Sequence, residues 1–212
     1  MPERNVTDAG GGPGQIVILN GVPRSGKTTI AGALQQRGPG VWVNLGVDAS
    51  IHSTPEHLRP GIGLRPGGER PDLEELVVVL YAALFESVAA HARLGLDVVV
   101  DVGLHESYSE PRHIRRDSAR RLAGLPVLFV GVRCPLNVIW QRRQKSWGQH
   151  RHDADPELVA AVQRWQEAVH QVTYDLEVDT AASSPVECAD LIAGRVGEGA
   201  PGVAFGPPDA QS

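Results

Sequence analysis

Short apolar runs alternate with longer amphipathic segments through the middle of the chain. Five of these runs contain β-branched residues and predict strands at Ile16–Asn20, Val41–Gly46, Asp97–Val102, Val127–Val132 and Tyr174–Val178. The third and fourth runs are almost wholly apolar, which is typical of strands that are buried on both faces. The pattern therefore predicts a sheet at the centre of the fold.

The segments between these runs have the periodicity of helices. Within 156–172, apolar residues recur every three or four positions and would form one face of a helix, and Asp72–Arg93 behaves in the same way. Ser184 before Pro185 is a typical helix start, as is Asp155 before Pro156. Strands that alternate with helices predict an α/β fold, a doubly wound parallel sheet whose ligands bind at the carboxyl ends of the strands.

The two ends of the chain differ from the middle. Residues 1–14 and 197–212 are rich in glycine and proline and lack apolar periodicity, so we expect flexible tails around one folded domain at 15–196.

Composition narrows the partners of this domain. The chain has 25 acidic and 20 basic residues, a net charge of −5, which disfavours nucleic acid and anionic membranes as partners. Its apolar runs are shorter than the ~20 residues that span a bilayer, and Met1 leads into no apolar leader, so a cytoplasmic protein is expected. Cys134 and Cys188 are too far apart in sequence to suggest a zinc site or a disulfide framework. A homo-oligomer stays possible.

The most specific motif follows the first predicted strand. It is the run Gly21-Val22-Pro23-Arg24-Ser25-Gly26-Lys27-Thr28, followed by Thr29 and a plausible helix. Strand, glycine-rich loop and helix are the setting of a phosphate-binding loop, in which backbone N–H groups and the helix N-terminus face the phosphates. We expect Lys27 to reach the β- and γ-phosphates of ATP and Thr28 to bind Mg²⁺. The alternative is a glycine-rich turn with a surface lysine.

The rest of the sequence separates the classes of protein that carry such a loop. A guanine-reading Asn-Lys-x-Asp element is absent, because the only lysines are Lys27 and Lys145 and neither follows an asparagine. Asp101 ends the third strand and suits an outer-shell ligand of Mg²⁺, although it could simply cap the strand. The next residue is Val102, where a motor-type ATPase usually has a glutamate that activates water. Among the classes of protein that carry such a loop, an enzyme that transfers a phosphoryl group to an acceptor molecule remains.

An acceptor kinase needs a group that orients and deprotonates a hydroxyl near the γ-phosphate. Asp48 follows the second predicted strand and would therefore lie at the carboxyl edge of the sheet, near the phosphates. We expect it to be the catalytic base. A cap of the helix that starts at Ala49 is the other interpretation, and the two roles can coexist.

Several blocks in order along 16–196 resemble chloramphenicol phosphotransferase. They are Ile16–Gly21 with the phosphate-binding loop, Leu45–Asp48, Gly131–Cys134, Tyr174–Thr180 and Val186–Ala189. The resemblance implies a P-loop kinase fold with strand order 2-3-1-4-5 and ATP-dependent phosphorylation of a hydroxyl on a small antibiotic, such as chloramphenicol. It also implies Asp48 as the base and Thr180 in the pocket for the nucleotide base.

The chain departs from that family at two places. The family's third strand ends in two aspartates, whereas here Val102 follows Asp101. The family also has an arginine-rich lid after the fourth strand, and Arg142 falls at its first arginine, so we expect Arg142 to bind the nucleotide and to act in catalysis. Arg143, Lys145 and Arg151 complete a cationic cluster suited to closing over phosphates, unless these residues lie on a solvated helix face.

A second basic run surrounds Asp117 and consists of Arg112, Arg115, Arg116, Arg120 and Arg121. In an acidic protein such a run predicts a solvated helix with i,i+4 ion pairs and no function of its own.

The acceptor is a small hydroxylated molecule, expected near the glycine- and proline-rich stretch 55–71. Candidate lining residues are Ile51, His52, His57, Ile62 and Leu64. An antibiotic kinase is the first hypothesis. A metabolite or nucleoside kinase and a nucleotide-binding protein without transfer chemistry are the alternatives.

Overall fold

A parallel sheet of five strands lies at the centre of the fold, with the order β2-β3-β1-β4-β5. In this computed structural model, residues 11–38, 40–59, 70–147, 156–199 and 202–206 are described. The strands are β1 (Ile16–Asn20), β2 (Trp42–Asn44), β3 (Asp97–Val102), β4 (Val127–Arg133) and β5 (Leu176–Asp179). Both the parallel sheet and the strand order confirm the sequence prediction.

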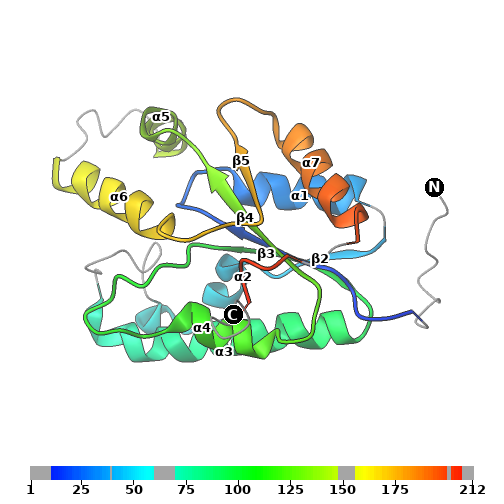
Figure 1. Cartoon of the computed structure of the whole chain (residues 1–212). Helices are drawn as coiled ribbons and strands as arrows, with labels where there is room; N and C mark the ends of the chain where they lie inside the picture. The colour runs from blue at the N-terminus through cyan, green and yellow to red at the C-terminus, as the bar shows by residue number, and fades with distance from the viewer. Residues whose placement is uncertain (1–10, 39, 60–69, 148–155, 200–201, 207–212) are drawn as a thin grey trace.

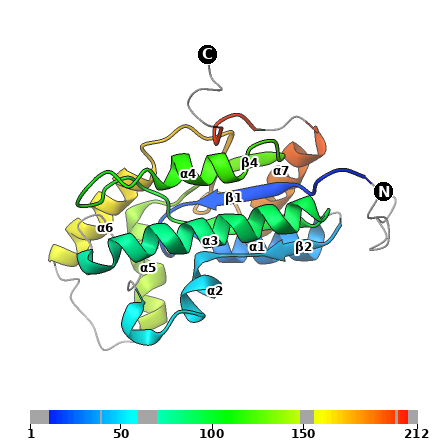
Figure 2. The same cartoon turned by 90° about the horizontal axis from the view of Figure 1, so that it is seen from below.

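Helices cover both faces of this sheet (Figure 1). They are α1 (Lys27–Arg37), α2 (Val47–His52), α3 (Glu74–Arg93), α4 (Ile114–Arg121), α5 (Leu136–Trp147), α6 (Pro156–Val169) and α7 (Pro185–Gly197), with short 3₁₀ turns at Glu56–Leu58 and Pro71–Leu73. In Figures 1 and 2, α3 and α4 lie along one face, α1 and α7 along the other, and α5 and α6 near one end of the sheet. No helix in the described ranges has the length and apolarity needed to cross a membrane.

Each face of the sheet has its own hydrophobic core, because the side chains of a strand alternate between its two faces. Ile16, Ile18 and Phe129 point to the side of α3 and α4, where they pack with Phe85 and Val88. Val17, Leu19 and Val130 point to the other side and pack with Ile30 of α1 and Ile192 of α7. This double burial explains why most positions of β1, β3 and β4 are apolar.

The predicted helix start at Ser184 is confirmed by its hydrogen bonds. The Ser184 hydroxyl accepts the backbone N–H of Glu187, and the Glu187 side chain accepts the backbone N–H of Ser184. This capping box fixes the first turn of α7. Pro185 stands at the start of the helix, where its missing N–H costs nothing.

The expectation of a flexible tail over 197–212 is wrong for residues 202–206. Phe205 is 3% exposed and lies 4.9 Å from Phe129 and 5.9 Å from Phe85, measured between ring centroids. The Asp175 carboxylate accepts the backbone N–H groups of Val203 and Ala204 at 2.7 and 2.9 Å. Three apolar residues between glycines are too few to show a periodicity, so the sequence pattern could not reveal this return to the core.

Candidate active site

The loop after β1 has the conformation that its glycines suggest. Gly26 has φ +105°, and a side chain there would also come within 3.2 Å of Thr180. At Gly21 a Cβ atom would lie 2.7 Å from the Val132 carbonyl oxygen, so the loop passes too close to β4 for any larger residue. Arg24 also has positive φ, 70°. The loop wraps tightly before α1, whose first N–H groups have no partners within the helix and favour an anion.

Lys27 holds this loop closed. Its Nζ donates to the carbonyl oxygens of Gly21 and Val22 at 2.8 and 3.0 Å. Burial lowers the pKa of Lys27 to about 8, while the charges of Asp101 and Asp48 raise it. Lys27 is therefore a partly desolvated cation with two carboxylates in electrostatic range, and added negative charge from a phosphate would stabilise it.

Thr28 and Asp101 lie side by side. The Thr28 hydroxyl donates to Asp101 Oδ2 at 2.7 Å, and Asp101 is 5% exposed. Gly46 sits so close that a Cβ atom there would lie 2.0 Å from Asp101 Oδ1. A hydroxyl and a carboxylate are the hard oxygen ligands that Mg²⁺ prefers, and Mg²⁺ commonly takes its other ligands from water and phosphate. Among the described residues no cluster of three acidic, histidine or cysteine side chains could hold a metal alone. These two residues therefore fit Mg²⁺ only as a partial ligand set that a bound phosphate would complete.

Asp48 lies in the first turn of α2, exposed to solvent. Because α2 begins at Val47, Asp48 does not cap a helix that starts at Ala49, and that alternative is wrong. Its charge raises the pKa of Lys27, so the carboxylate stands within electrostatic range of the phosphate-binding loop. The structure thus brings Lys27, Thr28, Asp48 and Asp101 to one end of the sheet.

Arg142 makes hydrogen bonds with the phosphate-binding loop and with Thr180. Its guanidinium donates to the carbonyl oxygens of Ser25 at 3.1 Å and Thr180 at 2.8 Å, and to the Thr180 hydroxyl at 3.0 Å. The Thr180 hydroxyl in turn donates to the Ser25 carbonyl at 2.6 Å. Arg142 and Thr180 therefore brace the outer side of the phosphate-binding loop against the segment after β5.

Two of the other cations expected with Arg142 are described, and they have different environments. Arg143 is 2% exposed, with its guanidinium 5.6 Å from the ring centroid of Trp140. Lys145 is exposed. Arg151 lies outside the described residues, as do Ile62, Leu64 and the side chain of Ile51 among the suggested acceptor contacts. His52 and His57 are exposed, and the Nδ1 atom of His52 is 2.5 Å from the Asp48 carbonyl oxygen.

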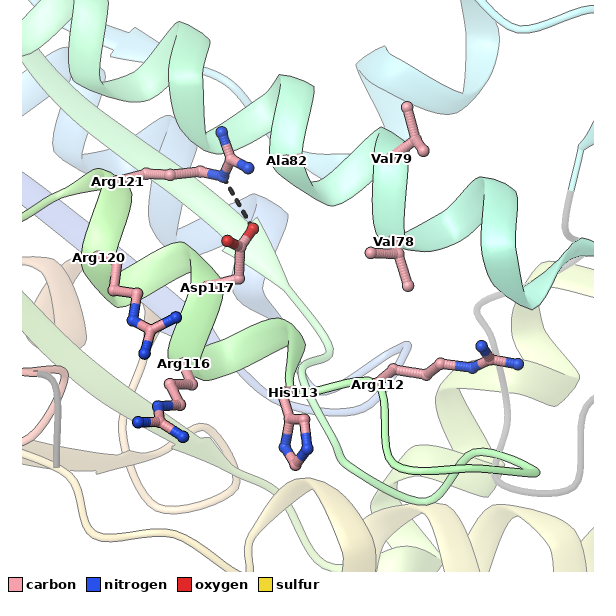
Figure 3. Close-up of a pocket in the computed structure, with 9 residues that line it drawn as sticks. All are labelled: Val78, Val79, Ala82, Arg112, His113, Arg116, Asp117, Arg120 and Arg121. Carbon is pink, nitrogen blue, oxygen red and sulfur yellow. Dashed lines mark hydrogen bonds and ion pairs between the residues drawn. The ribbon is translucent and has the colours of Figure 1, made fainter.

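The second basic run forms a groove between α3 and α4, with a volume of about 450 Å³. Arg121 pairs with Asp117 at 2.8 Å, the predicted i,i+4 pair, and with Glu86 on α3 at 2.6 Å. Figure 3 shows Asp117 and Arg121 facing α3, while Arg116 and Arg120 extend away from it. Arg112, at the other end of the groove, is bound by Glu74 and Glu75. These ion pairs join the two helices.

Sequence reasoning missed the residues that surround the end of β3. Tyr81 on α3 lies near Asp101, and burial raises its pKa while a hydrogen bond from the Gly103 N–H opposes the rise. His105 stacks on Tyr108, with 4.5 Å between ring centroids. The tyrosine and histidine residues have no motif spacing, and only the fold brings α3 beside the loop after β3.

Comparison with known proteins agrees with this geometry. Residues 14–197 match the family model described as chloramphenicol phosphotransferase-like protein. A tunicamycin resistance protein from Deinococcus radiodurans has a similar structure, with a TM-score of 0.61 and 20% identity over 87% of this chain and 96% of that one. No curated protein matches the chain at the level of sequence.

Two further structures share the fold. One is the APS kinase CysC of Mycobacterium tuberculosis, with a TM-score of 0.58 and 16% identity over 88% of this chain and 99% of that one. The other is a gluconokinase of Sinorhizobium meliloti, with a TM-score of 0.56 and 22% identity over 88% of this chain and 95% of that one. These likenesses show a P-loop kinase fold. The chain belongs to the chloramphenicol phosphotransferase-like family and is an ATP-dependent phosphotransferase.

Proposed function

We propose that this chain transfers the γ-phosphoryl group of ATP to a hydroxyl of an uncharged small molecule of the antibiotic type. The observation that carries the proposal is the grouping of Lys27, Asp48 and Asp101, whose charges interact at the phosphate-binding end of the sheet. A protein that only binds nucleotide has no use for a carboxylate such as Asp48 on its acceptor side.

In this reaction the acceptor oxygen forms a bond to the γ-phosphorus as the bond to the β,γ-bridging oxygen breaks, and ADP leaves. Asp48 orients the acceptor hydroxyl and takes its proton. Lys27 offsets the charge that moves onto the bridging oxygen. Thr28 and Asp101 would hold Mg²⁺, which supplies further charge neutralisation on the phosphates. Arg142 and Thr180 keep the loop in place and border the nucleotide site.

The charges between α2 and α3 favour an uncharged acceptor. An acidic metabolite needs an available cation in its site, but the described arginines of this region already have partners. Arg59 donates to the carbonyl oxygens of Thr54 and His52, and Arg70 pairs with Asp72. Arg112 is held by two glutamates. This supports a neutral hydroxylated acceptor over an acidic metabolite as the substrate class.

Labelled ATP and a panel of acceptors test the proposal. The panel contains neutral hydroxylated antibiotics, nucleosides, sugars and hydroxy acids, and we expect Mg²⁺-dependent transfer to a neutral hydroxylated antibiotic, with ATP preferred to GTP. Transfer only to a sugar, a hydroxy acid or a nucleoside would support the metabolite or nucleoside kinase instead.

The Asp48→Asn variant tests the base. It should bind ATP as the wild type does and lose roughly 10²–10⁴ in kcat, the usual range for a positioned acid or base. Asp190→Asn removes an exposed carboxylate that pairs with Arg37 at the surface, and it should keep full turnover. Full turnover in Asp48→Asn would eliminate Asp48 as the base.

A further inference from the structure

Asn20 is a buried polar residue to which neither the sequence analysis nor the proposed mechanism assigns a role. It is the last residue of β1, directly before Gly21 of the phosphate-binding loop, and it is 0% exposed. It pairs in register with Val102 of β3 and Gly131 of β4, so it lies at the centre of the sheet's carboxyl edge. A fully buried amide needs partners for all its polar atoms.

The partners of Asn20 come from two distant segments. Its Oδ1 accepts the backbone N–H of Leu104 at 2.7 Å, and its Nδ2 lies 3.5 Å from the Leu104 carbonyl oxygen. The same Nδ2 donates to the Val169 carbonyl oxygen at 3.2 Å and to the Tyr174 hydroxyl at 3.0 Å. One side chain thus joins the start of the phosphate-binding loop, the loop after β3 and the end of α6.

Leu104 belongs to the segment that borders the reacting groups. It follows Asp101 by three residues. The preceding residue, Gly103, packs against Gly21, because a Cβ atom on Gly103 would lie 3.4 Å from the Gly21 carbonyl oxygen. His105 and Tyr108 come next and form the stacked pair beside α3. The hydrogen bond between Leu104 and Asn20 therefore joins this segment to the phosphate-binding loop, in addition to the backbone hydrogen bond from the Gly21 N–H to the Val102 carbonyl oxygen.

The chemistry of the site requires an asparagine. Aspartate would keep the acceptor for Leu104 but would place a buried charge against two carbonyl oxygens and a hydroxyl, with no donor to offer them. Alanine would leave the Leu104 N–H without its acceptor, and the loop would have to move to find another.

We propose that Asn20 is a positioning residue for phosphoryl transfer, because it fixes the segment that follows Asp101 and Val102 relative to the phosphate-binding loop. The inference rests on the proposed function, in which Lys27 and Asp101 act on the phosphates at this end of the sheet. A displacement of about 1 Å is enough to cost up to about 10² in rate, even when binding is preserved.

Tyr174→Phe provides a matched control. The Tyr174 hydroxyl donates to the Val169 carbonyl oxygen at 2.9 Å and accepts from Asn20, so its loss weakens the same buried network. Its hydrogen bonds join it to Asn20, Val169 and His170, however, and not to Leu104. Asn20→Ala and Tyr174→Phe should both lower the melting temperature, but only Asn20→Ala releases the loop after β3.

Two measurements on the full chain, well below both melting temperatures, test the proposal. In hydrogen exchange, ADP should increase the protection of amides 103–108 in the wild type and in Tyr174→Phe but not in Asn20→Ala. In transfer assays, Asn20→Ala should lose about 10- to 100-fold in kcat with an unchanged ADP affinity, and Tyr174→Phe should keep its kcat.

The outcomes separate the inference from the proposed function. Preserved protection and turnover in Asn20→Ala, equal losses in both variants, or loss of ADP binding in Asn20→Ala would each overturn a positioning role. A wild type that binds ADP and protects 103–108 but phosphorylates no acceptor would contradict the proposed function alone, and the exchange data would still decide the role of Asn20.

Discussion

The low pKa of Lys27 predicts how the stability of the nucleotide-free protein responds to alkaline pH. In the unfolded chain the lysine titrates at its ordinary value of 10.5, whereas burial lowers the pKa in the folded protein to about 8. Between these values the unfolded chain keeps a proton that the folded protein has released. The free energy of unfolding therefore rises with pH in this window and is insensitive to Lys27 below about pH 8.

The magnitude follows from the size of the pKa difference. The pKa falls from 10.5 to about 8, which at about 1.4 kcal/mol per pKa unit corresponds to at most about 3–4 kcal/mol. Urea unfolding of the wild type and of Lys27→Met, at a series of pH values, isolates this contribution because all other titrating groups are shared. The stability of the wild type relative to Lys27→Met should increase from about pH 8 to 10.5.

The affinity for a nucleotide should change with pH in the opposite direction to the stability of the nucleotide-free protein. Phosphate charge favours the protonated lysine, so ADP affinity of the wild type should fall by up to about tenfold per pH unit above about pH 8, and that of Lys27→Met should not. A stability difference that stays flat or falls across the window would refute a desolvated Lys27 in the phosphate-binding loop.

Two further predictions concern packing. Arg142→Ala should lower the free energy of unfolding by about 1.5–3 kcal/mol and weaken ATP binding, because the Ser25 and Thr180 carbonyl oxygens lose a charged donor. Thermal unfolding and transfer assays measure the two effects. Unchanged stability with lost turnover would instead favour a lid role. Phe205→Ala should cost about 3–5 kcal/mol in urea unfolding, whereas Val203→Ala, at a position 74% exposed, should change stability by less than about 0.5 kcal/mol. Equal effects of these two substitutions would mean that 202–206 do not complete the core.

The parts of the fold that the sequence predicted are those governed by local rules. Burial on both faces makes most of β3 apolar, and its bounds at Asp97 and Val102 coincide with the predicted ones. The phosphate-binding loop is recognisable because its glycines and Lys27 have fixed spacing between a strand and a helix. Asp48 was identifiable because the carboxyl ends of parallel strands meet at one edge.

What the sequence could not predict depends on contacts between distant segments. Asn20 and Leu104 are 84 residues apart, and Asn20 and Tyr174 are 154 residues apart, so no sequence spacing predicts their hydrogen bonds. The hydrogen bonds of Arg142 could not be predicted for a similar reason. A cationic residue that follows a strand can contact a phosphate or can donate to backbone carbonyl oxygens. Only the location of Thr180 in the fold distinguishes these two possibilities for Arg142.

The return of residues 202–206 to the core bears on the order in which the protein folds during its synthesis. The aromatic face made by Phe85 and Phe129 is completed by Phe205, and Asp175 holds the backbone of Val203 and Ala204. Because the chain emerges from its N-terminus, β1 to β4 and the helices between them are available well before this closing segment. Until it arrives, the nascent sheet exposes two aromatic rings to other proteins, and such surfaces attract chaperones and promote aggregation. A chain that stops at residue 197, the last position of the family match, would keep that surface uncovered.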